Sequence, residues 1–189
     1  TGCLGGLTGA GEPTPGPLES LPAPMWGSGD APVTVVAFED FACPHCRRFV
    51  LGVLPRIVDE YVADGRVRYE HRDFPIPVDP TWSWRAPSAA RAVQNAEGAA
   101  AFFDFAGRLY EHLGSYDAAL VAGLAADVGA DGEATRRAAT TERYRPVIEA
   151  DRARGLDLGV DGTPAVFVEG ERLSGYSFDT VAAAVESHL

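Results

Sequence analysis

Two cysteines separated by two residues are the strongest chemical feature of this sequence. They form the segment Cys43-Pro44-His45-Cys46, and the other cysteine of the 189 residues is Cys3. Two intervening residues keep two sulfurs within reach of each other across one turn, so that a thiolate and a second thiol can exchange a disulfide. Because three cysteines cannot build a disulfide framework, the close pair indicates a redox or a metal role.

The elements around this pair are predicted from the hydrophobic pattern. Residues 33–38 form an apolar, β-branched run, which indicates a buried strand. Apolar residues then recur at helical spacing from Phe49 to Tyr61, so the cysteines open a helix. Gly52 and Pro55 interrupt that pattern and predict a bend.

This position has consequences for the thiols. Unpaired backbone N–H groups and the helix dipole favour a thiolate at Cys43. A donor or a positive charge on His45 would lower the pKa of that thiol further, and Pro44 stiffens the loop. Cys46 lies further into the helix and should be less accessible. Since a stable thiolate stabilises the reduced form, the disulfide is expected to be oxidising.

The rest of the chain contains alternating strand and helix patterns. Residues 66–72 alternate and predict a second strand, and residues 86–156 are rich in alanine. Pro87 suits the first turn of a helix, and Asp117 is a plausible helix cap. Helices are expected near residues 87–97, 99–113, 117–128, 132–139 and 142–155.

The last 30 residues predict a hairpin and a helix. We expect a strand at 164–168, a turn at 169–171, a short strand at 172–174 and a final helix near 178–188. The order of elements is therefore βαβ, a block of helices, and ββα.

The first 25 residues are rich in glycine, proline, serine and threonine, and they predict a flexible tether before a domain that starts near Trp26. Small residues before Cys3, followed by this stretch, are similar to the end of a lipoprotein cleavage box, so Cys3 would carry lipid and residues 4–24 would be the tether. The alternative is a stray cysteine in a disordered leader. No run of apolar residues is long enough to predict a transmembrane helix.

The composition argues against a nucleic-acid partner. The net charge is -11, and all 16 basic residues are arginine. An acidic surface repels phosphate backbones and anionic headgroups. An acidic chain without lysine is typical of a salt-rich habitat (a halophile), of a GC-rich genome, or of both.

A structural metal site is not expected. Zinc needs four ligands, usually from a second paired motif, and the sequence has none. His71, His112 and His188 are scattered, and each is expected to be a surface or packing residue. We therefore expect neither a metal nor a cofactor.

The motifs together resemble the DsbA family of thioredoxin-fold oxidoreductases, over roughly residues 27–188. The resemblance rests on the Cys43–Cys46 segment after a buried strand and on a later strand opened by Thr-Pro. It also includes residues 30–34 and 72–75. It implies an α/β thioredoxin fold with an inserted all-helical subdomain. The expected division is a tether at 1–25, thioredoxin parts at 26–84 and 158–189, and a helical insertion at 85–157.

The resemblance also implies a second half of the site and a cellular role. Pro164 would be cis and face the cysteine pair, and the backbone of Thr163 would pair with an extended substrate segment. The protein would act outside the cytoplasm, anchored at the cell surface if Cys3 is lipidated. Its substrates would be reduced or unfolded secreted proteins, and a membrane-bound partner would reoxidise it.

One position departs from the family pattern. Relatives often carry a buried glutamate six residues before the first cysteine, thought to aid proton movement, and Ala37 stands there. Glu39 lies two residues on and faces the same side of the strand, so it is a candidate for proton transfer. The alternative is that Glu39 and Asp40 are solvated acids at a strand end.

Three other functions stay open. The same fold can run in the opposite direction, as a disulfide reductase or isomerase. A lipid-tethered client-binding or chaperone module would leave the cysteines without a catalytic role. A non-redox transferase on the same scaffold is disfavoured by two cysteines in a helix-opening pair.

Overall fold

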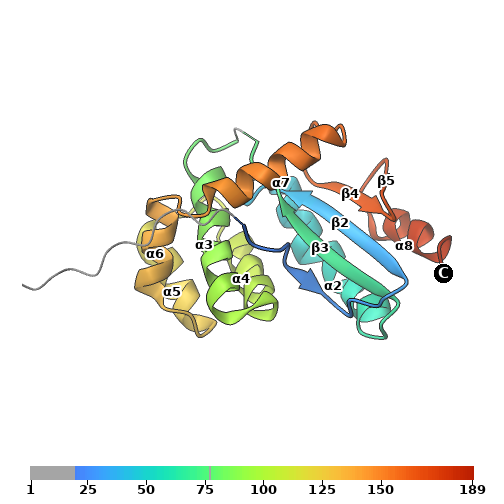
Figure 1. The fold of residues 1–189 in the computed structure, drawn as a ribbon, viewed down its shortest axis with the longest axis horizontal. Coiled ribbons are helices and arrows are strands. Elements are labelled where there is room, and N and C mark those ends of the chain that lie inside the picture. Colours follow the sequence, from blue (N-terminus) through green and yellow to red (C-terminus); the bar gives the residue numbers. More distant parts are fainter. Residues whose placement is uncertain (1–19, 77) are drawn as a thin grey trace, which may run out of the picture.

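The computed structural model describes residues 20–76 and 78–189. Within these residues, a five-stranded sheet has the order β1-β3-β2-β4-β5 (Figure 1). The pair β2–β3 is parallel, and the other neighbours are antiparallel. The strands are β1 (Met25–Trp26), β2 (Val33–Glu39), β3 (Val67–Asp73), β4 (Ala165–Val168) and β5 (Glu171–Arg172). The expected order of βαβ, helices and ββα is observed.

The central strand β2 separates two apolar cores. Val35 and Ala37 lie in the larger core, together with the helix that follows β2. Val36 and Phe38 belong to a smaller core on the opposite face, where Phe74 also lies. Successive side chains of a strand point to opposite faces, so both faces of β2 are covered and the strand reads as a continuous apolar run.

The helix after β2 is irregular, as Gly52 and Pro55 predict. It consists of α1 (Pro44–Arg48), a π-helical turn η1 (Phe49–Val53), α2 (Leu54–Ile57) and a second π-helical turn η2 (Val58–Val62). The first wide turn ends two residues before Pro55, whose ring removes a backbone donor from the regular α-helical pattern.

The inserted helices gather at one end of the sheet, and the last of them runs back along it (Figure 1). They are α3 (Trp82–Glu97), α4 (Ala99–Glu111), α5 (Ala118–Asp127), α6 (Gly132–Thr140) and α7 (Arg145–Asp157). The Asp117 side chain accepts a hydrogen bond from the backbone of Leu120 and caps α5, as expected.

The expected start of α3 was wrong. Pro87 lies inside the helix and not in its first turn, because α3 begins at Trp82. The Asp79 side chain accepts hydrogen bonds from the backbone N–H groups of Thr81 and Trp82, each at 2.8 Å, and so starts the helix five residues before the proline. The helical block therefore begins before residue 85.

The expected C-terminal hairpin is also shifted. Val168 pairs with Glu171, so the turn contains only Glu169 and Gly170, with φ of 48° and 85°. Two positive φ values are typical of the tight turns that match the strand twist. The last strand thus starts at Glu171 and not at residue 172, and α8 (Phe178–Glu186) follows.

The expected tether, residues 1–25, extends too far, because its last residues are hydrogen-bonded to the folded domain. The backbone oxygen of Pro22 accepts hydrogen bonds from Arg91 and Gln94 of α3. The oxygen of Pro24 accepts one from His71, and β1 pairs with β3. Residues 20–25 are therefore docked on the domain. Residues 1–19, including the expected lipidation site Cys3, lie outside the described residues.

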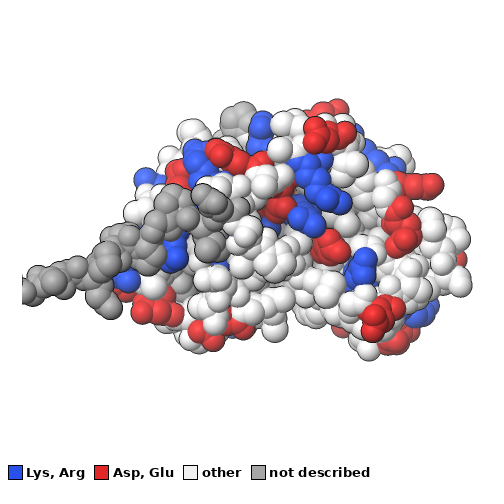
Figure 2. Space-filling view, viewed as in Figure 1, with Lys and Arg blue, Asp and Glu red and all other residues white. Residues whose placement is uncertain are grey.

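The surface of the described part mixes charges of both signs. On the face in Figure 2, acidic and arginine side chains are interspersed and do not form one basic patch. No helix of the described residues is long and apolar enough to cross a membrane.

Helix α7 approaches the sheet closely at Gly155. A Cβ atom there would lie 2.6 Å from Phe74 Cδ2 and 3.0 Å from Phe38 Cδ1. Both rings are buried in the smaller core. A glycine is therefore required where this helix crosses the sheet, because close-packed rings leave no room for a methyl group.

Replacing Gly155 by alanine should destabilise the protein by about 1–3 kcal/mol, because overpacking outweighs the better helix propensity of alanine. The measurement is urea denaturation. Gly123→Ala in α5 is the matched control, since nothing lies within 4 Å of its added Cβ. That control should gain about 0.4–1 kcal/mol. Equal effects of the two substitutions would contradict the close packing.

Candidate active site

The cysteine pair opens the first helix. Cys43 is the N-cap residue of α1, with φ of -88° and ψ of 122°, and Pro44 follows it in the first turn. The backbone N–H of Cys43 is bonded to the oxygen of Asp40 at 3.0 Å, which fixes the turn into the helix. Both thiols are free and buried, with 3% of Cys43 and 0% of Cys46 exposed. The structure thus brings the pair together at a helix N-terminus, as the sequence predicts.

The Cys43 thiol is strongly acidified. The neighbouring Cys46 thiol makes the largest contribution, and Thr163 and the backbone N–H groups of Cys46 and His45 add to it. These interactions outweigh burial, which acts in the opposite direction, and lower the pKa of Cys43 to about 5. Cys43 is therefore a thiolate at neutral pH.

Cys46 has the opposite character. Burial raises the pKa of its thiol well above the ordinary value, and the nearby Cys43 and Glu39 raise it further. The backbone N–H of Asp40 lies 3.5 Å from Cys46 Sγ and is a weak opposing donor. The pair therefore consists of one thiolate and one protonated thiol, and Cys46 must lose its proton before it attacks anything.

The Thr163–Pro164 segment lies against Cys43. The peptide bond between the two residues is cis. Cys43 Sγ lies 3.5 Å from the backbone oxygen of Thr163, although 120 residues separate them in sequence. The segment precedes β4, whose antiparallel pairing with β2 brings it beside the start of the helix.

The His45 imidazole was expected to act on Cys43, and in the structure it contacts Tyr176 and Arg48. Its Nδ1 atom lies 2.8 Å from the Tyr176 hydroxyl and 2.7 Å from Arg48 Nη2, on the exposed surface. The backbone N–H of His45 contributes to the lowered pKa of Cys43. The imidazole turns toward α8 because Tyr176, just before that helix, offers it a hydrogen-bond partner.

Glu39 is buried, so its expected solvation at a strand end was wrong. Only 1% of the residue is exposed. The hydroxyl of Tyr69 donates to Oε1, and that of Tyr110 donates to Oε2 at 3.0 Å. Ala37 pairs with His71 of β3, and Glu39 lies further along the same face of β2, where it acts electrostatically on Cys46. An acid behind the thiol is therefore present two residues later than the family pattern has it.

Asp40 is also buried, and it holds the loops around the pair. Its carboxylate accepts hydrogen bonds from the backbone N–H of Ala42 at 2.8 Å and of Ile76 at 2.7 Å. Burial raises the pKa of Asp40 to about 6 against these two hydrogen bonds. Asp40 thus ties the active-site turn to the loop that follows β3.

His71 was expected to be an ordinary surface or packing residue, and it is a buried, charged one. Nε2 lies 3.0 Å from Asp73 Oδ1, and Nδ1 lies 3.6 Å from Glu39 Oε1. Burial opposes the charge, but the two acids outweigh it and raise the pKa of His71 to about 9. The signal was the alternation of β3, which places His71 on the inward face with Val67 and Tyr69.

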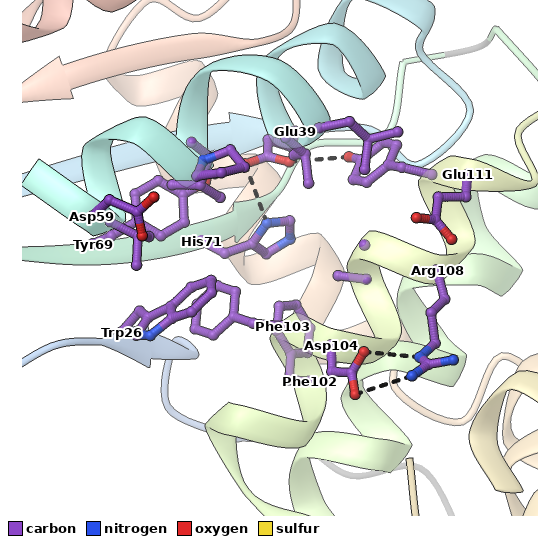
Figure 3. Close-up of a pocket in the computed structure, with 18 residues that line it drawn as sticks. Trp26, Glu39, Asp59, Tyr69, His71, Phe102, Phe103, Asp104, Arg108 and Glu111 are labelled. Atoms are coloured by element: carbon purple, nitrogen blue, oxygen red, sulfur yellow. Dashed lines mark hydrogen bonds and ion pairs between the residues drawn. The ribbon is translucent and has the colours of Figure 1, made fainter. Parts of the chain in front are cut away.

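A pocket of about 640 Å³ reaches this buried acid from the side of α4 (Figure 3). Glu39, His71 and Tyr69 lie at one side of it, and Trp26 and Phe103 lie at the other. The Trp26 and Phe103 rings are stacked with centroids 5.0 Å apart. The environment of Glu39 is therefore in contact with a cavity that does not include the cysteines.

Several known proteins with related sequences are named for disulfide bond formation. A family model described as Thioredoxin matches residues 19–187. The probable disulfide bond formation protein D of Bacillus cereus is 28% identical over 170 residues, which cover 86% of this chain and 77% of that protein. Disulfide bond formation protein D of Bacillus subtilis is 25% identical and covers 88% and 77%.

A different context for the same kind of sequence occurs in an antiporter. Na(+)/H(+) antiporter NhaA 1 of Salinispora arenicola is 34% identical over 165 residues, which cover 85% of this chain. The match spans only 24% of the antiporter.

Solved structures agree with the fold. Oxidised BdbD from Bacillus subtilis has a TM-score of 0.81 at 24% identity and covers 88% of this chain and 92% of that one. Chlamydia trachomatis DsbA has a TM-score of 0.76 at 17% identity and covers 92% and 95%. The fold is the expected α/β thioredoxin fold with a helical insertion. This chain belongs to the thioredoxin family and is a DsbA-type thiol–disulfide oxidoreductase.

Proposed function

We propose that this protein donates the Cys43–Cys46 disulfide to reduced proteins outside the cytoplasm. The observation that carries the proposal is the contrast between the two thiols, with the pKa of Cys43 at about 5 and that of Cys46 raised. A thiolate stabilised in the folded protein stabilises the reduced form, so the disulfide is a strong oxidant and Cys43 is a good leaving group from the mixed disulfide.

The reaction transfers two electrons from the substrate to the cysteine pair. A substrate thiolate attacks Cys43 Sγ, the Cys43–Cys46 bond breaks, and Cys46 leaves with the electron pair and takes up a proton. A second substrate thiolate then attacks the substrate sulfur of the mixed disulfide. Cys43 leaves as the stabilised thiolate, and the substrate carries the new disulfide.

Four further residues support this exchange in distinct ways. Pro44 stiffens the first turn, and the backbone N–H of His45 stabilises the Cys43 thiolate. Thr163 and Pro164 place backbone beside Cys43, where an extended substrate segment can pair with it as a short strand.

Glu39 exchanges the proton of Cys46. Its carboxylate is buried, acts on Cys46 and adjoins a cavity that is separate from the substrate side. A base in this position can take the Cys46 proton when the reduced pair is reoxidised and return it when Cys46 leaves the disulfide.

The relatives support the proposed place of action and the proposed partners. Proteins named for disulfide bond formation support reduced secreted proteins as substrates and a membrane-bound partner that reoxidises the pair. A lipid on Cys3 would hold the domain at the membrane surface, and the stretch between Cys3 and residue 20 would act as its tether. No nucleic acid and no cofactor take part.

Two other activities remain as alternatives to test. A reductase or isomerase would use the same cysteines with a less oxidising pair. A client-binding module would not need either thiol, so its client binding would survive Cys43→Ser and Cys46→Ser together.

Titration of the thiolate by its ultraviolet absorbance should give a midpoint near pH 5 in the reduced protein. Cys46→Ala should raise this midpoint, because the Cys46 thiol is the largest cause of the lowered pKa. Cys43→Ser should remove the transition. The proposed role of Cys46 as a donor to the thiolate fails if Cys46→Ala leaves the midpoint in place.

Equilibration with a glutathione buffer should show that the cysteine pair is strongly oxidising. Its reduction potential should lie closer to that of DsbA, about -120 mV, than to that of thioredoxin, about -270 mV. Mass spectrometry of trapped protein would report the oxidised fraction. Cys43→Ser should abolish oxidation of a reduced substrate, whereas Cys46→Ser treated with oxidised glutathione should stop at the mixed disulfide between Cys43 and glutathione. A pair as reducing as thioredoxin would favour the reductase.

Glu39→Gln should slow the second step of reoxidation by oxidised glutathione, in which Cys46 must lose its proton, by about 100-fold at neutral pH. The first step, attack by the Cys43 thiolate, should be nearly unchanged. Stopped-flow fluorescence separates the two steps. Glu111→Gln, an exposed acid that lines the same pocket, is the control and should leave both rates unchanged.

A further inference from the structure

His71 lies between two carboxylates in the core. Only 2% of the residue is exposed. Asp73 lies 3.0 Å from Nε2, and Glu39 lies 3.6 Å from Nδ1. A neutral imidazole has one N–H and one lone pair, so it can donate to only one of the two acids. The imidazolium has an N–H on each nitrogen, one hydrogen-bonded to Asp73 and the other facing Glu39 in an ion pair, so the site suits the cation.

The arginines near His71 form ion pairs with other carboxylates, Asp73 and Asp151. Arg91 Nε lies 2.7 Å from Asp73 Oδ2, and Arg91 Nη2 lies 2.5 Å from Asp151 Oδ2. Arg72 pairs with Asp151 as well, at 2.8 Å. Within the described residues, His71 is the cation paired with Glu39. The charge of His71 is thus the one that compensates the acid behind Cys46.

We propose that His71 is a positioning residue for the thiol chemistry: its ion pair with Glu39 holds that buried carboxylate in place as the base for Cys46. This inference rests on the proposed role of Glu39. Without the cation, two tyrosine hydroxyls alone would face a buried carboxylate, and a buried charge that has lost its ionic partner is strongly unfavourable.

The charge state of His71 supports this role over the working range of pH. Its pKa is raised to about 9, so the cation is present at neutral pH and is lost as pH rises through that value. The base function of Glu39 should weaken with it. Two acids contact the imidazole directly, Glu39 on β2 and Asp73 on β3. The other titratable or charged groups nearby belong to the same hydrogen-bonded network: Tyr69 on β3, Arg91 on α3, Tyr110 on α4 and Asp151 on α7.

The surroundings of His71 also provide an access route for a probe. The rings of Phe41 and Phe102 pack on the imidazole with centroids 5.6 and 5.1 Å away. His71 itself lines the 640 Å³ pocket (Figure 3). Replacing His71 by alanine should leave a cavity between the Phe41 and Phe102 rings that is continuous with the pocket. A free imidazole can then enter this cavity and replace the missing ring.

The test is a double-mutant cycle of His71→Asn and Glu39→Gln, with the pH profile of the second reoxidation step as the readout. In the wild type, this rate should change little across neutral pH, because Glu39 takes the proton. In Glu39→Gln the rate should rise tenfold per pH unit as Cys46 ionises. His71→Asn should slow the step at pH 7 by about tenfold and shift the profile toward that of Glu39→Gln.

The double variant distinguishes positioning from a merely structural role. If His71 acts through Glu39, adding His71→Asn to Glu39→Gln changes nothing further. A His71→Asn effect that persists undiminished in the Glu39→Gln background overturns the inference. If Glu39→Gln itself leaves the profile unchanged, the proposed role of Glu39 fails instead. His112→Asn, an exposed histidine after α4, is the control and should behave as wild type.

Chemical rescue keeps the inference testable if the asparagine variant is poorly folded. His71→Ala should be slow in the second step, and millimolar imidazole should restore at least part of the wild-type rate and pH profile. Pyrazole has the same shape but stays neutral at this pH, and it should not rescue. Rescue by both azoles would indicate a packing role and overturn the inference, as would rescue by neither in a folded variant.

Discussion

The burial of the Glu39 carboxylate behind Cys46 is the constraint on which much of the remaining architecture depends. A carboxylate without water needs hydrogen bonds and a nearby cation, or it takes up a proton. Its hydrogen bonds come from Tyr69 on the sheet and from Tyr110 on the inserted helix α4. The cation is His71 on β3. The helical insertion is therefore part of the active-site environment and not merely attached to the fold.

The contrast between the two thiols arises from a small difference in position. Cys43 precedes the first turn and receives hydrogen bonds from the helix N-terminus and from Cys46. Cys46, one turn later, is fully buried and feels the negative charge of Glu39, and no comparable set of donors offsets the desolvation of its thiolate. The same type of side chain thus has a lowered pKa at the start of the turn and a raised pKa one turn later.

Local patterns in the sequence were sufficient to predict the main strands and helices of the fold. The apolar run at 33–38 and the cap at Asp117 are local signals, and both elements formed as expected. The partners of Glu39 were not predictable in this way, since Tyr110 lies 71 residues further along the chain. For His45, proximity in sequence suggested an effect of the imidazole on Cys43, but the hydroxyl of Tyr176, 131 residues away, was not predictable as its partner. At Ala37 the departure from the family pattern was visible in the sequence, and the buried acid on this face of the strand is Glu39.

The pairing of Arg91 with Asp73 and Asp151 has a mechanical consequence. One guanidinium on α3 holds the end of β3 and the middle of α7, so it fastens both ends of the insertion to the same point of the sheet. An insertion fixed at its entrance and at its exit has little freedom to swing as a lid. In an encounter with an unfolded client, the enzyme is then the rigid partner, and nearly all of the conformational adjustment falls to the client chain.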